Sequence, residues 1–168
     1  ASNNTAVGYQ SQYSNTTGAP NTSVGVTSLY SNTTGTNNAA FGTDALYANT
    51  TGGANTALGR SALFNNTTAN NNTAVGYQAG YSNTTGTHNT FIGFGAASNA
   101  VALTGAENTS LGSSSLYNLS SGSYNTAIGR QALASNTTAS NNTAVGYQAG
   151  YGTTTGGSNT TLGYTAGY

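Results

Sequence analysis

The sequence predicts an all-β fold, a parallel β-solenoid (β-roll) of ten coils with about 17 residues in each coil. The first observation is a repeat, because the segment Asn72 to Gly86 returns almost letter for letter at Asn142 to Gly156 and in a close variant at Asn4 to Gly18. The second is its period. A marker glycine after a large apolar residue recurs eight times at an interval of 17 residues and once at 19, which is the signature of stacked repeats. The marker glycines are Gly8, Gly25, Gly42, Gly59, Gly76, Gly93, Gly112, Gly129, Gly146 and Gly163.

The residues around each marker glycine predict a short β-strand. Gly, Asn, Thr and Ser are weak helix formers, and the apolar positions do not recur at helical spacing. Thr-Ala-Val-Gly-Tyr instead alternates as a strand does. We expect the large residue directly before the marker to point inward, opposite a small residue three positions after it. The predicted core is Val7, Val24, Phe41, Leu58, Val75, Ile92, Leu111, Ile128, Val145 and Leu162.

The rest of each coil predicts a second strand and a return turn. Ala45 to Tyr47 and Ala62 to Phe64 are typical of the second strand, and Ser82 to Gly86 is typical of the turn, where Asn and Gly tolerate a positive φ. An aromatic residue five positions after the marker predicts a stacked column along the axis. Its members are Tyr13, Tyr30, Tyr47, Phe64, Tyr81, Tyr117, Tyr151 and Tyr168.

An asparagine stands four positions before every marker glycine. Identical amides stacked about 4.8 Å apart can bond to one another, so these residues predict a hydrogen-bonded ladder inside a turn. The predicted ladder is Asn4, Asn21, Asn38, Asn55, Asn72, Asn89, Asn108, Asn125, Asn142 and Asn159.

The domain organisation is a single repeat array over residues 1–168. One coil, within residues 94–111, is two residues longer than the others, and we expect the extra residues to form a bulged turn in the segment Ala97 to Glu107. The neutral, polar composition alone would be compatible with disorder. The fixed period favours the folded alternative.

The composition excludes several classes of function. Only 2% of the residues are charged, so the clustered Lys and Arg that nucleic acid and anionic membranes require are absent. No apolar run approaches the length of a membrane span, and no membrane insertion is expected. The only carboxylates, Asp44 and Glu107, lie about four coils apart, roughly 19 Å, beyond the reach of an acid/base pair. We therefore expect no enzyme, no metal and no cofactor, with His88 exposed in a turn and Arg60 paired with Asp44 at the surface.

Six Asn-x-Thr triplets match the acceptor pattern for N-glycosylation. The signal is weak, because a repeat built from Asn and Thr produces such triplets by composition. The possible sites are Asn15, Asn32, Asn49, Asn66, Asn83 and Asn136.

The repeat unit Asn-Thr-Ala-Val-Gly-Tyr-Gln-Ala, followed by Tyr-Ser-Asn-Thr-Thr-Gly, resembles the repeats of bacterial and phage tail-fibre-domain proteins. It is also similar to the Asn-Ser-x-Ala-Ile-Gly-x-x-Ala repeats in the heads of trimeric autotransporter adhesins, although the coil here is longer. The resemblance covers nearly the whole chain. It implies a left-handed parallel β-roll, three chains packed side by side, and a place at the cell surface.

Three functions fit this sequence. The first is a structural or adhesive fibre segment, extracellular or on a cell or virion surface, that self-associates end to end or as a lateral trimer and contacts surface glycans. The second is an ice-binding β-roll that uses the Thr file three positions before the markers, provided that the file does not face the core. The third is a carbohydrate-binding module. The candidate sugar-stacking stripe of the fibre, whose Tyr77 position the module would also use, is Tyr9, Tyr77, Tyr147 and Tyr164, and lateral packing between chains is the alternative role for these residues.

Overall fold

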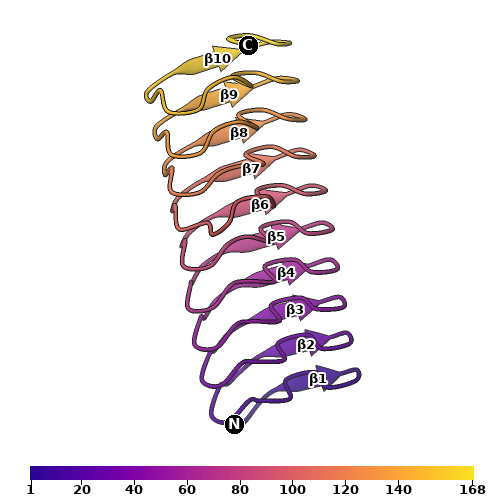
Figure 1. The fold of residues 1–168 in the computed structure, drawn as a ribbon. Coiled ribbons are helices and arrows are strands. Elements are labelled where there is room, and N and C mark those ends of the chain that lie inside the picture. The colour runs from indigo at the N-terminus through magenta and orange to yellow at the C-terminus, as the bar shows by residue number, and fades with distance from the viewer.

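The computed structural model describes residues 1–168 as one parallel β-solenoid, which confirms the predicted fold class. Ten strands lie in a single sheet in sequence order, each one lap of the chain beyond the last, and the turns of successive coils lie above one another (Figure 1). The strands are β1 (Thr5–Val7), β2 (Thr22–Val24), β3 (Ala39–Phe41), β4 (Thr56–Leu58), β5 (Thr73–Val75), β6 (Thr90–Ile92), β7 (Thr109–Leu111), β8 (Thr126–Ile128), β9 (Thr143–Val145) and β10 (Thr160–Leu162).

Neighbouring strands pair in the register that the repeat predicts. Thr73 lies opposite Thr90, and Val75 opposite Ile92, so equivalent residues stack directly on one another. At the usual strand spacing of about 4.8 Å, ten coils make a rod of roughly 48 Å. The register also continues across the longer coil, where Thr90 pairs with Thr109. The two extra residues are therefore absorbed in the turn, whose tip at Val101 is fully exposed.

The predicted second strand is wrong. Residues 45–47 and 62–64 lie in a bend, and Leu46 and Leu63 have left-handed backbone conformations with φ of 53° and 51°. The bend still pairs with the next coil, since the Leu46 N–H donates to the Ala62 carbonyl at 3.0 Å. Hydrogen bonds of this kind to the neighbouring coils satisfy the backbone N–H and C=O groups of the bend. The chain can therefore turn sharply here without forming a second sheet.

Backbone hydrogen bonds outside the strands hold most of the solenoid together. Of 106 backbone–backbone bonds, only 18 lie within the strands and the other 88 lie in the turns and loops, most of them joining one coil to the next. The turns are therefore as regular as the sheet, and each coil is fixed around its whole circumference.

The predicted core is wrong in its direction. None of the ten large residues before the markers is buried; Leu58 is 50% exposed and Val7 is 55% exposed. In a three-residue strand the two outer side chains share one face, and here that face is the outer one. Six members of the predicted core are exposed, Val7, Val24, Phe41, Leu58, Leu111 and Leu162, and four are half-buried, Val75, Ile92, Ile128 and Val145.

The actual core is built from the small central residue of each strand and the residues three and four positions after the marker. Ala57, Ala62 and Leu63 form one such set, all completely buried. The expected small residue three positions after the marker does face the core, but its partner is the leucine in the bend. Placing that leucine inside requires the left-handed conformation described above, which its tight packing maintains.

The marker glycines are required by a close backbone approach. Gly76 has a φ of 132°, and a Cβ added to it would lie 2.6 Å from the carbonyl oxygen of Gly93 in the next coil. Neither the conformation nor the space admits a side chain. The same contact repeats for the nine marker glycines from Gly8 to Gly146, and Gly163, which has no coil beyond it, shares only the positive φ.

Candidate functional site

The asparagine ladder forms as predicted along the whole chain. From Asn4 to Asn142, each side-chain Oδ1 accepts a hydrogen bond from the backbone N–H of the equivalent asparagine one coil later, as Asn55 Oδ1 does from Asn72 at 3.0 Å. The Nδ2 of Asn72 donates to the Gly86 carbonyl at 2.8 Å, across the interior of the coil. Each amide thus joins two coils and two sides of one turn, so this ladder is a structural element rather than a ligand site.

A second asparagine ladder occupies the sites that match the glycosylation pattern. Asn49 is completely buried, and its Nδ2 donates to Asn32 Oδ1 and to the Gly52 carbonyl, both at 2.9 Å. Because these amide nitrogens point inward, the folded chain cannot carry glycans on them. The prediction is therefore wrong for the five fully buried residues Asn32, Asn49, Asn66, Asn83 and Asn136, and Asn15 is half-buried with both of its Nδ2 bonds made inside the coil.

The second ladder ends abruptly at the longer coil. Leu103 lies above Asn83, and the Asn83 Oδ1 is the one buried side-chain oxygen or nitrogen in the structure without a hydrogen-bond partner. The cause is the sequence itself, because the leucine side chain has no amide group that could donate a hydrogen bond to Asn83. Leu103 and Leu119, both fully buried, replace the ladder with apolar packing, and Asn136 beyond them bonds only within its own turn, to Ala139.

The predicted tyrosine stripe is broken into clusters. Tyr9, Tyr77 and Tyr164 are exposed and Tyr147 is half-buried, but Val26, Thr43 and Ser113 occupy the same position in other coils. Tyr77 stacks on Phe94 with ring centroids 5.2 Å apart, and Tyr147 stacks on Tyr164 at 5.1 Å.

Each of these aromatic pairs carries an arginine on its N-terminal side. The Arg60 guanidinium lies 5.9 Å from the Tyr77 ring centroid, and that of Arg130 lies 5.8 Å from the Tyr147 ring centroid. The expected ion pair of Arg60 with Asp44 is wrong, since Asp44 instead accepts a hydrogen bond from Thr27. Arginine is therefore used as a cation on an aromatic face, an interaction that survives exposure to water.

The aromatic column forms as predicted but is interrupted. Five rings, Tyr13 to Tyr81, stack continuously with centroids 5.0 to 5.3 Å apart, and Tyr151 stacks on Tyr168 at 5.5 Å. Ser98 and Ala134 take the ring position in the coils between.

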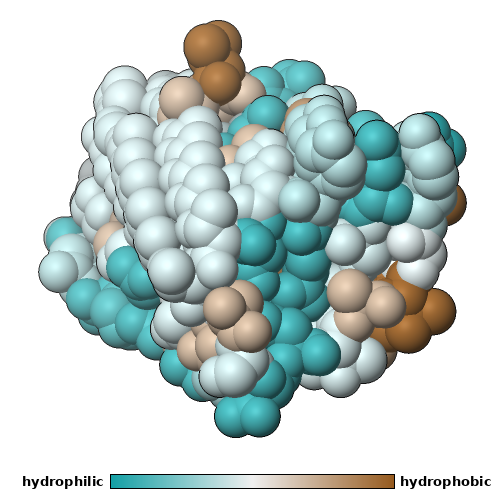
Figure 2. All heavy atoms as spheres, turned by 90° about the horizontal axis from the view of Figure 1, so that it is seen from below, coloured by the Kyte–Doolittle hydropathy of each residue, from teal (hydrophilic) through white to brown (hydrophobic).

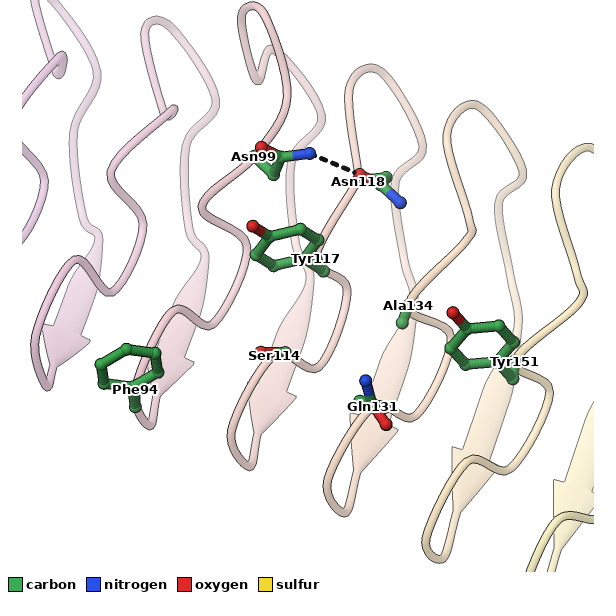
Figure 3. Close-up of a pocket in the computed structure, with 8 residues that line it drawn as sticks. All are labelled: Phe94, Asn99, Ser114, Tyr117, Asn118, Gln131, Ala134 and Tyr151. Carbon is green, nitrogen blue, oxygen red and sulfur yellow. Dashed lines mark hydrogen bonds between the residues drawn. The ribbon is translucent and has the colours of Figure 1, made fainter.

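A hollow of about 410 Å³ lies at the second of these interruptions (Figure 3). Tyr117 and Tyr151 stand on either side of Ala134, and the amides of Asn118 and Gln131 lie at the edge of the space. The sequence contained the signal for this hollow, because Ala134 is an exception to the aromatic position. The complete lining is Phe94, Asn99, Ser114, Tyr117, Asn118, Gln131, Ala134 and Tyr151.

The outer face of the sheet carries two parallel files of side chains. The Thr file three positions before the markers points outward, as Thr56 and Thr143 show by their exposure, next to the file of large apolar residues that includes Val75. The condition that the sequence left open for ice binding is therefore met. An end-on view shows side chains of like hydropathy aligned along the axis (Figure 2).

The charged and histidine side chains are few, namely Asp44, Arg60, His88, Glu107 and Arg130. His88 is exposed in a turn, as expected, and its Nε2 lies 3.1 Å from Asn71 Nδ2. The structure contains no group of three His, Asp or Glu side chains close enough together to hold a metal ion. The fold contains no helix with the length and apolarity of a membrane-crossing segment.

Comparison with protein-family models, with curated proteins and with solved structures found no match to this chain.

Proposed function

We propose that this chain is a structural and adhesive segment of an extracellular fibre, on a cell or virion surface. The observation that carries the proposal is the uninterrupted register of all ten strands, with Asn on Asn in every coil and Thr on Thr in all but the third, where Ala39 takes the Thr position. Such a ladder makes a stiff rod of constant cross-section. The resemblance of the repeat to tail-fibre and adhesin-head repeats supports the same role.

The ends of the sheet supply a route to assembly. The outer edges of β1 and β10 are unpaired within these 168 residues, so a further coil can continue the ladder, whether it belongs to the same polypeptide or to a second copy. In every inner coil the N–H of the first strand residue donates to the next coil, as Thr143 does to Asn159. The N–H of Thr160 is the equivalent donor on the open edge of β10.

Electron microscopy combined with sedimentation tests this proposal. We expect elongated particles whose length grows with protein concentration. Thr160→Pro removes the free donor of β10 without breaking a bond inside the chain, and it should shorten the particles, whereas the matched control Thr160→Val should not. Round, monodisperse monomers at all concentrations would refute the fibre proposal.

The adhesive part of the proposal involves the two arginine–aromatic clusters. Exposed aromatic rings are suited to stack on the apolar faces of sugars. We expect a glycan array to give a signal that Tyr77→Ala and Tyr164→Ala weaken and that Tyr124→Ala, an exposed tyrosine outside the clusters, leaves unchanged. Equal signals from all three variants would limit the chain to a structural role.

Ice binding is a second candidate, favoured by the outward direction of the Thr file. Nine threonines and the adjacent apolar file repeat at the strand spacing of about 4.8 Å on one face of the sheet. Thermal hysteresis measurements decide the matter. Activity that Thr73→Lys and Thr90→Lys abolish would support ice binding, and no hysteresis at millimolar protein would exclude it.

A further inference from the structure

The interruption of the aromatic column at Ala134 leaves a space of defined shape. In the continuous part of the column each ring lies 5.0 to 5.3 Å from the next, and the planes of adjacent rings differ by 13° or less. Tyr117 and Tyr151 occupy the same position two coils apart, with the small side chain of Ala134 between them (Figure 3). The hollow there, of about 410 Å³, is the one pocket in the structure.

The width of this space matches one ring. Two coil spacings separate the rings of Tyr117 and Tyr151 by roughly 10 Å. A ring placed halfway lies about 5 Å from each, which is the separation found in the rest of the column and within the range of favourable offset stacking. We propose that this hollow is a binding site for a neutral aromatic ring, which lies between Tyr117 and Tyr151 and completes the stack.

The edge of the hollow adds a preference for a polar substituent. Asn118 accepts a hydrogen bond from Asn99 Nδ2 at 2.9 Å, and Gln131 Oε1 accepts one from Gln148 at 3.0 Å. These bonds orient both amides and leave Asn118 Nδ2 and Gln131 Nε2 without a protein partner. Two donors beside an aromatic slot suit a hydroxyl oxygen on the ring, as in a phenol.

The lining also disfavours charged ligands. None of its eight residues is an Arg, a Lys or a His, so a carboxylate would lose hydration without gaining a counter-charge, and an ammonium group cannot accept the hydrogen bonds that the two free amide donors offer. The class of ligand is therefore an uncharged phenol, either a free molecule or the tyrosine side chain of a peptide or another chain.

Ligand-observed saturation-transfer NMR with p-cresol, the side-chain analogue of tyrosine, tests the site on the full chain. We expect p-cresol to bind, and cyclohexanol and methyl glucoside to bind at least threefold more weakly, because a saturated ring does not stack as an aromatic one does. A second measurement with N-acetyltyrosine amide distinguishes a free phenol from a tyrosine side chain as the ligand. This compound can bind only if the hollow also has room for the peptide backbone attached to the ring.

Three variants locate the binding. Ala134→Tyr fills the slot with the column's own residue and should abolish p-cresol binding. Tyr117→Leu and Tyr151→Leu each remove one face and should weaken binding roughly three- to tenfold. Tyr30→Leu, a ring from the continuous part of the column, is the matched control and should leave binding unchanged.

Several results would overturn the proposal. They are no p-cresol signal at millimolar concentration, equal binding of cyclohexanol, binding that persists in Ala134→Tyr, and an equal loss in Tyr30→Leu. Circular dichroism of each variant establishes that it is folded, and if Ala134→Tyr does not fold, the two leucine variants against Tyr30→Leu decide the question.

Discussion

At the scale of the residue, the buried asparagines show how a repeat depends on its neighbours. Asn49 Oδ1 is useful only because Asn66, one coil later, donates to it at 2.9 Å. Asn83 has no such successor, and its Oδ1 is left without a partner. The side-chain amide of an asparagine at this position therefore makes all of its hydrogen bonds in one coil and only some of them in another.

This difference predicts unequal costs for one substitution. Asn49→Leu leaves Asn32 Oδ1 without its donor and adds one unpaired buried oxygen to the structure. Asn83→Leu removes one unpaired oxygen and creates another at Asn66, so their number does not change. Urea unfolding should show Asn49→Leu to be the more destabilising by about 1–3 kcal/mol. Equal losses would indicate that solvent reaches Asn83.

A marker glycine should tolerate no side chain. Gly76→Ala forces a Cβ into a positive-φ conformation and against the Gly93 carbonyl of the next coil. We expect a loss of about 3 kcal/mol in the free energy of unfolding. Gly152→Ala is the control, because an added Cβ there meets nothing closer than 3.6 Å, and thermal unfolding should show almost no change. A similar loss in both variants would contradict the steric explanation.

At the scale of the element, the volume of the core is balanced between adjacent coils. Phe91 is the only large residue at the centre of a strand, and the bend residue beside it is Gly80 instead of leucine. A Cβ on Gly80 would lie 2.6 Å from the Phe91 ring. Thr161 and Gly150 repeat this exchange near the C-terminus, where the added Cβ would lie 3.1 Å from the Thr161 hydroxyl.

The exchange predicts strong coupling between two substitutions. Phe91→Ala alone should cost about 3–5 kcal/mol through the cavity that it leaves. Gly80→Leu alone should also destabilise the protein, because it overfills the same space. The double variant recreates the alanine–leucine pair of the other coils and should lose less stability than Phe91→Ala alone. A double-mutant cycle by urea unfolding measures the coupling, and additive losses would contradict it.

The sequence predicted the coil period, the strand register, the asparagine ladder and the aromatic column. It did not predict which side of the strand faces inward. Alternation in Thr-Ala-Val is compatible with either direction, and residue size alone favours the larger residue inside. The deciding feature was the leucine of the bend, whose left-handed conformation is uncommon for a residue with a side chain and is not a property of leucine. The pairing of Phe91 with Gly80 was the signal that could have revealed the true core.

The functional surfaces were predictable to a different extent. The ring slot at Ala134 follows from an exception in one aligned position, but its open volume depends on the path of the longer coil and on side-chain directions. The buried state of Asn49 and its equivalents could not be read from the triplet pattern, because that pattern describes local sequence and not the direction of the amide. The outward Thr file became clear only when the core was placed.

At the scale of the whole molecule, coils are interchangeable units. Each contacts only its neighbours, so stability should be approximately a sum over coils and interfaces. Deletion of residues 60–76, one full period, joins Gly59 to Tyr77 and keeps every file in register. We expect a folded nine-coil protein with the same far-ultraviolet circular dichroism per residue. Deletion of residues 60–68, about half a period, should abolish folding, and a folded product would contradict the stacking register.

The direction of the backbone hydrogen bonds determines how the rod responds to force. They run from coil to coil, along the axis, so the coil interfaces lie in series between the two termini, and under tension we expect them to separate one after another. A coil that peels away releases 17 residues, about 60 Å of extended chain, from a layer about 4.8 Å thick. When the molecule is stretched end to end, we expect the coils to unfold in small, repeated steps and to dissipate mechanical energy over a long extension.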